Sequence, residues 1–161
     1  MKVTAKIDAK NLEGKLAELR GRLDDCTPGM IRVGDVIVKH ARAAFSNPAE
    51  RPEAWPPLAE STIAARKRKG VKDTSPLVEK GTLSRSPRVV AADKSSVTVG
   101  SDRKTDDEKT PVHSIAAIHQ FGTKNGRIPA RPFFPIEGNG FTAKVATEIT
   151  ETFGKWLLGA K

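Results

Sequence analysis

The chain has 161 residues, of which 37% are hydrophobic, and a formal net charge of +9. This length suits one domain, so we expect a single unit from residue 1 to residue 161. The single cysteine, Cys26, excludes a disulfide within the chain and is expected to be a buried or idle thiol. No stretch approaches the ~20 apolar residues of a membrane span and no apolar leader is visible, so we expect a soluble product of the cytosol.

The N-terminal part predicts a short strand followed by a helix. Residues 3–7 alternate apolar and polar side chains, as a half-buried strand does. After a cap at Asp8 or Asn11, leucines recur at spacings of four, three and four residues and draw one apolar stripe along a helix that ends near residue 26. The stripe consists of Leu12, Leu16, Leu19 and Leu23.

A second helix restarts at Thr27, the expected N-cap, with Pro28 at the first helical position, where proline is well tolerated. Apolar residues cover two sides of this helix up to about residue 46, which is typical of a central helix packed by more than one partner. A loop with four prolines follows from 47 to 57. We expect this loop to be mobile, with Trp55 pinning it to the core rather than binding a partner.

A third helix is expected from residue 59 to residue 69, where it carries the strongest basic cluster of the chain. The cluster consists of Arg66, Lys67, Arg68 and Lys69. Cations at a helix C-terminus complement the helix dipole, so a solvated helix end is the plainer interpretation. The alternative is a patch that faces DNA or an acidic partner, and contact with nucleic acid would weaken steeply with salt.

The middle of the chain predicts a hairpin and a polar loop. Residues 88–92 and 96–100 are rich in β-branched side chains and are separated by a turn at 93–95. Residues 101–110 contain no apolar side chain, so they cannot bury anything and are expected to form a mobile loop.

Residues 114–136 form the most tightly specified stretch, with three of the six phenylalanines of the chain. A short helix is expected to end at Gly122, and a turn at Asn125-Gly126 leads into a proline-rich arm. The last helix carries apolar residues from Phe141 to Trp156 at spacings of three and four. The fold class is therefore α+β: helices packed on a small antiparallel sheet, long mobile loops and a C-terminal amphipathic helix.

The pattern of histidines and carboxylates favours neither a metal site nor an enzyme. His113 and His119 lie six residues apart, which turns them about 120° from each other on a helix. The acidic pairs stand at a helix end and in the polar loop, where general acid–base catalysis is not supported. We expect no catalytic residue, no metal and no cofactor; a small hydrolase that uses His119 remains an alternative.

Several fragments, taken in order, suggest a family. They are Trp55-Pro56-Pro57-Leu58, Thr62, Lys67 to Gly70, Leu77, Gly81, Leu83, Ala117-Ile118-His119-Gln120-Phe121-Gly122 and Ile128-Pro129-Ala130-Arg131-Pro132-Phe133. From about residue 8 onward this order resembles the virion morphogenesis family of tailed phages and prophages, of the Mu protein G type, which includes tail-completion proteins. Two positions depart from the family pattern: Ala59 where Ser is common, which removes a helix cap worth ~1 kcal/mol, and Lys80 where Thr is usual.

The resemblance implies a structural protein that completes the tail or the head–tail junction so that heads and tails can join. It implies other tail or neck proteins as partners, self-association into a ring, and a place first in the host cytoplasm and then in the virion. No membrane and no small-molecule substrate are implied. Loops at 47–55 and 101–110 are candidates for reaching a neighbour, and the positive charge would suit a channel that passes DNA.

The same resemblance implies structural or interface roles for the motif residues. These are Trp55, His119, Gln120, Phe121, Gly122, Ile128, Pro129, Arg131, Pro132 and Phe133. We predict that the side chains of His119 and Gln120 hydrogen-bond within the loop that follows them. The alternative function is a basic module that binds nucleic acid without sequence preference.

Overall fold

The computed structural model describes residues 9–71, 75–101 and 111–160, and within them the chain is α+β as predicted. The strand expected at 3–7 lies outside the described residues. The helices are α1 (Ala9–Asp24), α2 (Thr27–Ala43), the short 3-10 helix η1 (Pro48–Glu50), α3 (Glu60–Arg68), α4 (Val112–Phe121) and α5 (Ala143–Leu158). The strands are β1 (Arg88–Ala92), β2 (Val97–Gly100), β3 (Ile136–Glu137) and β4 (Gly140–Phe141).

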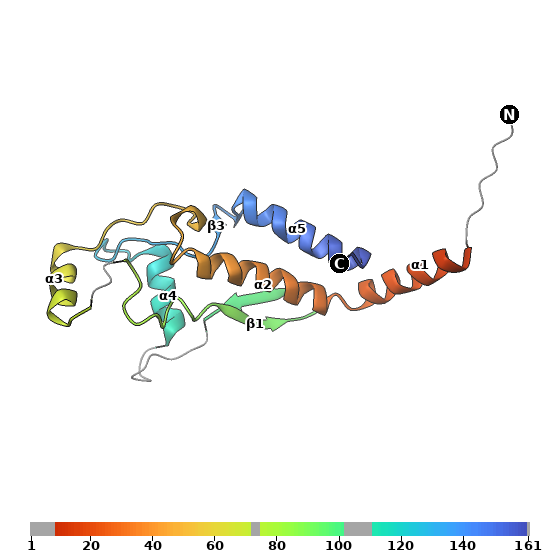
Figure 1. The fold of residues 1–161 in the computed structure, drawn as a ribbon, viewed down its shortest axis with the longest axis horizontal. Helices are drawn as coiled ribbons and strands as arrows, with labels where there is room; N and C mark the ends of the chain where they lie inside the picture. Colours follow the sequence, from red (N-terminus) through yellow and green to blue (C-terminus); the bar gives the residue numbers. More distant parts are fainter. Residues whose placement is uncertain (1–8, 72–74, 102–110, 161) are drawn as a thin grey trace, which may run out of the picture.

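Helix α2 is the central element, which confirms the interpretation of its two apolar sides. It packs against α5 on one side and against the β1–β2 hairpin on the other (Figure 1). Two glycines make this close packing possible: a Cβ at Gly29 would collide with the Trp156 ring, and a Cβ at Gly34 would lie 2.6 Å from a Val89 methyl. Any larger residue at either position would push α2 away from its neighbours.

The expected hairpin is present, and a second, smaller one accompanies it. Strands β1 and β2 pair antiparallel with a bulge between Val89 and Ala91. In the turn, hydrogen bonds from the backbone and hydroxyl groups of Ser95 and Ser96 hold the pKa of Asp93 to about 2. Strands β3 and β4 form a separate pair of two residues each, too short for an alternating pattern to reveal.

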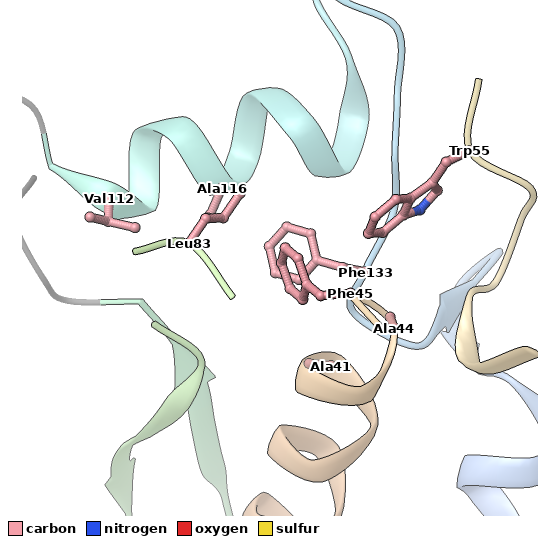
Figure 2. Close-up of a cluster of buried hydrophobic side chains, with 8 residues drawn as sticks. All are labelled: Ala41, Ala44, Phe45, Trp55, Leu83, Val112, Ala116 and Phe133. Atoms are coloured by element: carbon pink, nitrogen blue, oxygen red, sulfur yellow. The ribbon is translucent and has the colours of Figure 1, made fainter. Parts of the chain in front are cut away.

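The main apolar cluster lies where the end of α2 meets α4 and the proline-rich arm (Figure 2). Phe133 is 1% exposed and its ring packs against Phe45, with centroids 5.0 Å apart. Trp55 meets the same Phe45 ring edge-on at 5.7 Å. The cluster consists of Ala41, Ala44, Phe45, Trp55, Leu83, Val112, Ala116 and Phe133.

A second set of contacts joins α2, α5 and η1 through charged groups. The buried ring of His40 presents Nδ1 to a Glu50 oxygen at 2.6 Å and Nε2 to a Glu148 oxygen at 2.7 Å. Both contacts are hydrogen bonds when the ring carries a proton on each nitrogen. Lys39 pairs with Glu148, and Lys144 pairs with Glu50. The cluster, defined by these five residues, is called the His40 cluster below.

Helix α1 differs from the other long helices because it has no buried residue. It extends beyond the body formed by α2, α5 and the hairpin (Figure 1). It contacts α5 near its C-terminal end, where Arg22 Nη1 donates to the carbonyl of Leu157 at 3.0 Å. Among the helices that the structure describes, none is both long enough and apolar enough to cross a membrane.

Candidate partner-binding groove

The stretch from 119 to 131 folds back on itself because of one glycine and one short turn. Gly122 has φ +74°, and a Cβ there would lie 3.0 Å from the Ala130 nitrogen. Thr123 closes the turn, since its backbone N–H donates to the carbonyl of Ile128 and its hydroxyl accepts from the Ile128 N–H. The Arg131 N–H then donates to the His119 carbonyl at 2.6 Å, which ties the arm to the end of α4.

Gln120 holds the proline-rich arm from inside, as predicted. Its side-chain oxygen accepts from the backbone N–H groups of Phe133 and Phe134, at 3.1 Å and 3.0 Å. Its side-chain nitrogen donates to the Phe134 carbonyl. Gln120 is buried, so these bonds satisfy backbone groups that water does not reach easily.

Hydrogen bonds join the proline-rich arm to the Trp-Pro-Pro segment, and each of the two segments supplies a donor: Arg131 from the arm and Trp55 from the Trp-Pro-Pro segment. The buried Arg131 guanidinium donates to the carbonyls of Pro56 and Pro57 at 2.9 Å and 2.8 Å. The indole N–H of Trp55 donates to the Pro132 carbonyl at 2.7 Å. The prediction that Trp55 pins its loop to the core is confirmed.

The 47–57 segment is attached at further points besides Trp55. Arg51 donates to the Ala44 carbonyl, and its guanidinium lies 4.0 Å from the centre of the Trp55 ring. Asn47 caps η1 through its side chain. This segment is therefore a poor candidate for reaching a neighbour, and residues 102–110 of the other candidate loop lie outside the described residues.

The side chain of His119 does not make the hydrogen bond to the following loop that was predicted for it. Its side chain is half-buried, and its Nδ1 is enclosed without a hydrogen-bond partner among the described residues. Burial lowers the pKa of His119, and the charge of Arg131 lowers it further. The ring is therefore neutral near pH 7. The loop contact at this residue is made by its backbone carbonyl instead.

These segments enclose a groove of about 820 Å³. Its walls come from α3, from one face of α4 and from three connecting segments. It is lined by residues 56–59, Thr62, Arg66, Leu77, residues 79–83, Ile115, His119, residues 127–129 and Arg131. Prolines and aliphatic side chains make up much of this lining, so the groove offers an apolar surface.

Most of the fragments that carry the family resemblance meet in this groove. The lining combines Ile128, Pro129 and Arg131 of the Ile-Pro-Ala-Arg motif with Pro56-Pro57-Leu58, Thr62, Leu77, Gly81 and Leu83. They are far apart in the sequence, and no local pattern indicates that they meet. The sequence predicted a helix end, a turn and a proline-rich arm in residues 114–136, but it did not indicate the groove or its lining residues Ile115, Glu79 and Arg127.

The basic cluster of α3 does not form one patch. Arg66 is 6% exposed; it donates to the Ser75 carbonyl at 2.9 Å and lies 4.0 Å from Glu79. The prediction of a four-residue surface patch is therefore wrong for Arg66, which points inward and lines the groove. Lys67, Arg68 and Lys69 are exposed.

The groove has a positive balance. Among its described lining residues, four side chains are cationic and Glu79 is acidic. The four are Arg66, Lys80, Arg127 and Arg131. Such a lining favours an acidic partner, because field lines concentrate in a concave, partly apolar surface.

Phe121 stands apart from the other motif residues. It is 75% exposed at the end of α4, and Ile118 of the same helix is 37% exposed. Both lie on a different side of α4 from Ala116 and Gln120, which are buried. An aromatic side chain this exposed is a natural contact point for another protein.

The described residues supply little for catalysis. No group of three or more His, Cys, Asp or Glu side chains in the described part of the chain could hold a metal ion. No carboxylate is bonded to the His119 ring among the same residues, so nothing orients it as a general base.

A family model described as the phage virion morphogenesis family matches residues 7–158, nearly the whole chain. The chain therefore belongs to this family and takes part in phage virion morphogenesis, which implies contact with other virion proteins. No curated protein and no solved structure is significantly similar to it.

Proposed function

We propose that this chain is a non-enzymatic structural protein that completes the tail or the head–tail junction, so that heads and tails can join. Its place is first the host cytoplasm and then the finished virion. The observation that supports this most is the groove, because residues that carry the family resemblance line it and the described residues form no catalytic arrangement there.

The groove receives an acidic segment with apolar side chains from a neighbouring tail or neck protein. Its apolar walls suit aliphatic side chains, and its cationic residues suit carboxylates. Arg131 and Gln120 keep the walls in place by bonding to backbone groups, so the surface is formed before a partner arrives.

The same proposal includes a ring of copies joined by head-to-tail contacts, which close when the rotation between copies allows it. The exposed Phe121 is a candidate for such a contact. The net charge of +9 and the exposed Lys67, Arg68 and Lys69 are suited to a channel that passes DNA without reading its sequence. Replacing these three residues with neutral ones is expected to abolish any salt-dependent shift in the electrophoretic mobility of duplex DNA.

Electron microscopy of lysates that lack this chain tests the main proposal. Full heads beside separate tails are expected, and intact particles would refute the joining role. The groove is tested by Thr62→Trp, which fills it from an exposed position of α3. The expected result is a fall of at least about tenfold in infectious particles, as for a blocked hot spot.

Ser61→Trp is the matched control, because Ser61 is also exposed on α3 but does not line the groove. It should leave particle yield unchanged. Equal loss of yield with both variants, or with neither, would count against the groove as the partner site.

A further inference from the structure

Helix α1 presents an apolar stripe that the described residues of the chain leave exposed. Leu12, Leu16 and Leu23 are 50%, 54% and 57% exposed. Leu19 and Arg22 are partly buried, and Arg22 reaches the Leu157 carbonyl of α5. The rest of the helix projects from the body (Figure 1). A stripe of leucines at such exposure requires a partner surface.

Helix α1 also has low intrinsic stability. Gly14 and Gly21 stand in its interior, and each costs about 1 kcal/mol of helix stability relative to alanine. A Cβ at either glycine would meet nothing within 4 Å, so neither glycine serves a close approach within the chain. An isolated helix of 16 residues with two glycines is marginal in water, and packing of its apolar stripe on a second helix would stabilise it.

The leucine spacing of four, three and four is that of alternate a and d positions in a coiled coil. If two copies of α1 run antiparallel around a two-fold axis, Leu12 lies opposite Leu23 of the second copy and Leu16 lies opposite Leu19. The stripe is then self-complementary along its whole length, and the two-fold axis passes between Leu16 and Leu19.

Charges beside the stripe favour this direction. In the antiparallel pair, Glu13 of each copy lies opposite Arg20 of the other, which gives two attractive contacts by symmetry. In a parallel pair, Lys15 would face Arg20 instead, with like charges on both sides. The antiparallel pair does bring Lys15 near Arg22 on the other flank, but Arg22 is already bonded to Leu157 and lies 3.8 Å from Glu18.

We propose that two copies of this chain associate in solution through antiparallel pairing of α1. The contact is small, two heptads on each side, so the dimer is weak and exchanges readily. A two-fold contact of this kind is isologous and does not extend around a ring. It describes the chain before assembly and stands whether or not the chain completes a tail.

Sedimentation equilibrium of the full chain from about 5 to about 500 µM tests the pairing. The average mass should rise with concentration from 17.4 kDa toward twice that value. Leu16→Glu should raise the dissociation constant by at least about tenfold. Because Leu16 is exposed, the variant should keep the circular dichroism and melting temperature of the parent at low concentration.

Ala17→Glu is the matched control, because it places the same side chain on α1 but away from the stripe. Its dissociation constant should stay within about twofold of the parent value. A chain that stays monomeric throughout the concentration range, or association that Leu16→Glu leaves unchanged, would overturn the proposal.

Charge reversal tests the direction of the pair. Glu13→Arg and Arg20→Glu should each weaken association by roughly three- to tenfold, because each puts like charges together at two symmetric places. The double variant should restore it. Tighter association of Arg20→Glu alone would indicate parallel helices and would refute the antiparallel arrangement.

Discussion

Two regions of the molecule join distant segments in opposite ways. In the groove region, Trp55, Gln120 and Arg131 each bond to backbone groups of another segment. In the His40 cluster, side chains bond to side chains, and the acceptors are the carboxylates of Glu50 and Glu148. The first network depends on backbone geometry, and the second depends on protonation.

The difference shows which region can tolerate a change of conditions. Backbone carbonyls and amides do not titrate, so the bonds that hold the groove walls do not depend directly on pH; His119 is the titrating histidine of the described groove lining. The His40 cluster loses its acceptors when the carboxylates take up protons. The predictions below test this contrast, from the largest expected effect to the smallest.

Phe133→Ala should have the largest effect. Phe133 is 1% exposed and packs against Phe45 and Phe134 in the main apolar cluster, which supports the proline-rich arm beside the groove. Removal of a buried phenylalanine ring costs about 3–5 kcal/mol. Urea unfolding at pH 7 measures the loss. A change below about 1 kcal/mol would show that the aromatic cluster does not support the arm.

Gln120→Leu keeps a side chain of similar volume but leaves the Phe133 and Phe134 N–H groups without their acceptor. Each unsatisfied buried group costs about 1–3 kcal/mol, so we expect a loss of about 2–4 kcal/mol in unfolding free energy. Denaturant titration gives the value. Lys124→Gln, on the exposed turn nearby, is the control and should be neutral.

Acid should weaken the ion pairs of the His40 cluster. The pKa of Glu50 lies below its ordinary value of 4.5 because of the bond from Lys144 and then that from His40. The pKa of Glu148 is lowered in the same way by Lys39 and then His40. A lowered folded pKa gives stability that is present above 4.5 and is lost as pH falls below it.

The urea midpoint should therefore fall between pH 6 and pH 3, and Glu148→Gln should flatten that fall, because its amide does not titrate. The tryptophan fluorescence of the groove region should change only with global unfolding. If the urea midpoint of Glu148→Gln falls with pH as steeply as that of the parent, Glu148 does not contribute to the acid response.

Trp55→Phe should have the smallest effect of these changes. It removes the N–H that donates to Pro132 but keeps an aromatic ring against Phe45. The Pro132 carbonyl then lacks its partner, and we expect a loss of about 1–2 kcal/mol in denaturant unfolding. A loss above about 4 kcal/mol would mean that the ring, rather than the bond, secures the loop.

Local features were predictable from the sequence because their causes are local. The hairpin at 88–100 followed from β-branched residues around a turn, and the end of α4 followed from Gly122. The stripe on α1 was also visible, but the sequence did not reveal that the described part of the chain leaves it exposed. Periodicity indicates which side of a helix is apolar, and it does not indicate what covers that side.

The groove was not predictable for a different reason. Its walls come from two helices and three connecting segments that lie far apart in the sequence, and they meet through bonds such as that from Arg131 to Pro57, 74 residues away. Arg66 shows the same limit, because a basic run gave no indication that one of its members turns inward. Such positions depend on tertiary geometry, which a single sequence does not display.

The bond from Trp55 to Pro132 joins residues that are 77 positions apart. Contacts of that separation close large loops, so they form late in folding, after hairpins and helices. During synthesis the groove cannot exist until residue 133 has left the ribosome, although α2 and the β1–β2 hairpin are complete by residue 100. A partner that binds in the groove would therefore ignore nascent chains that have not yet passed this point.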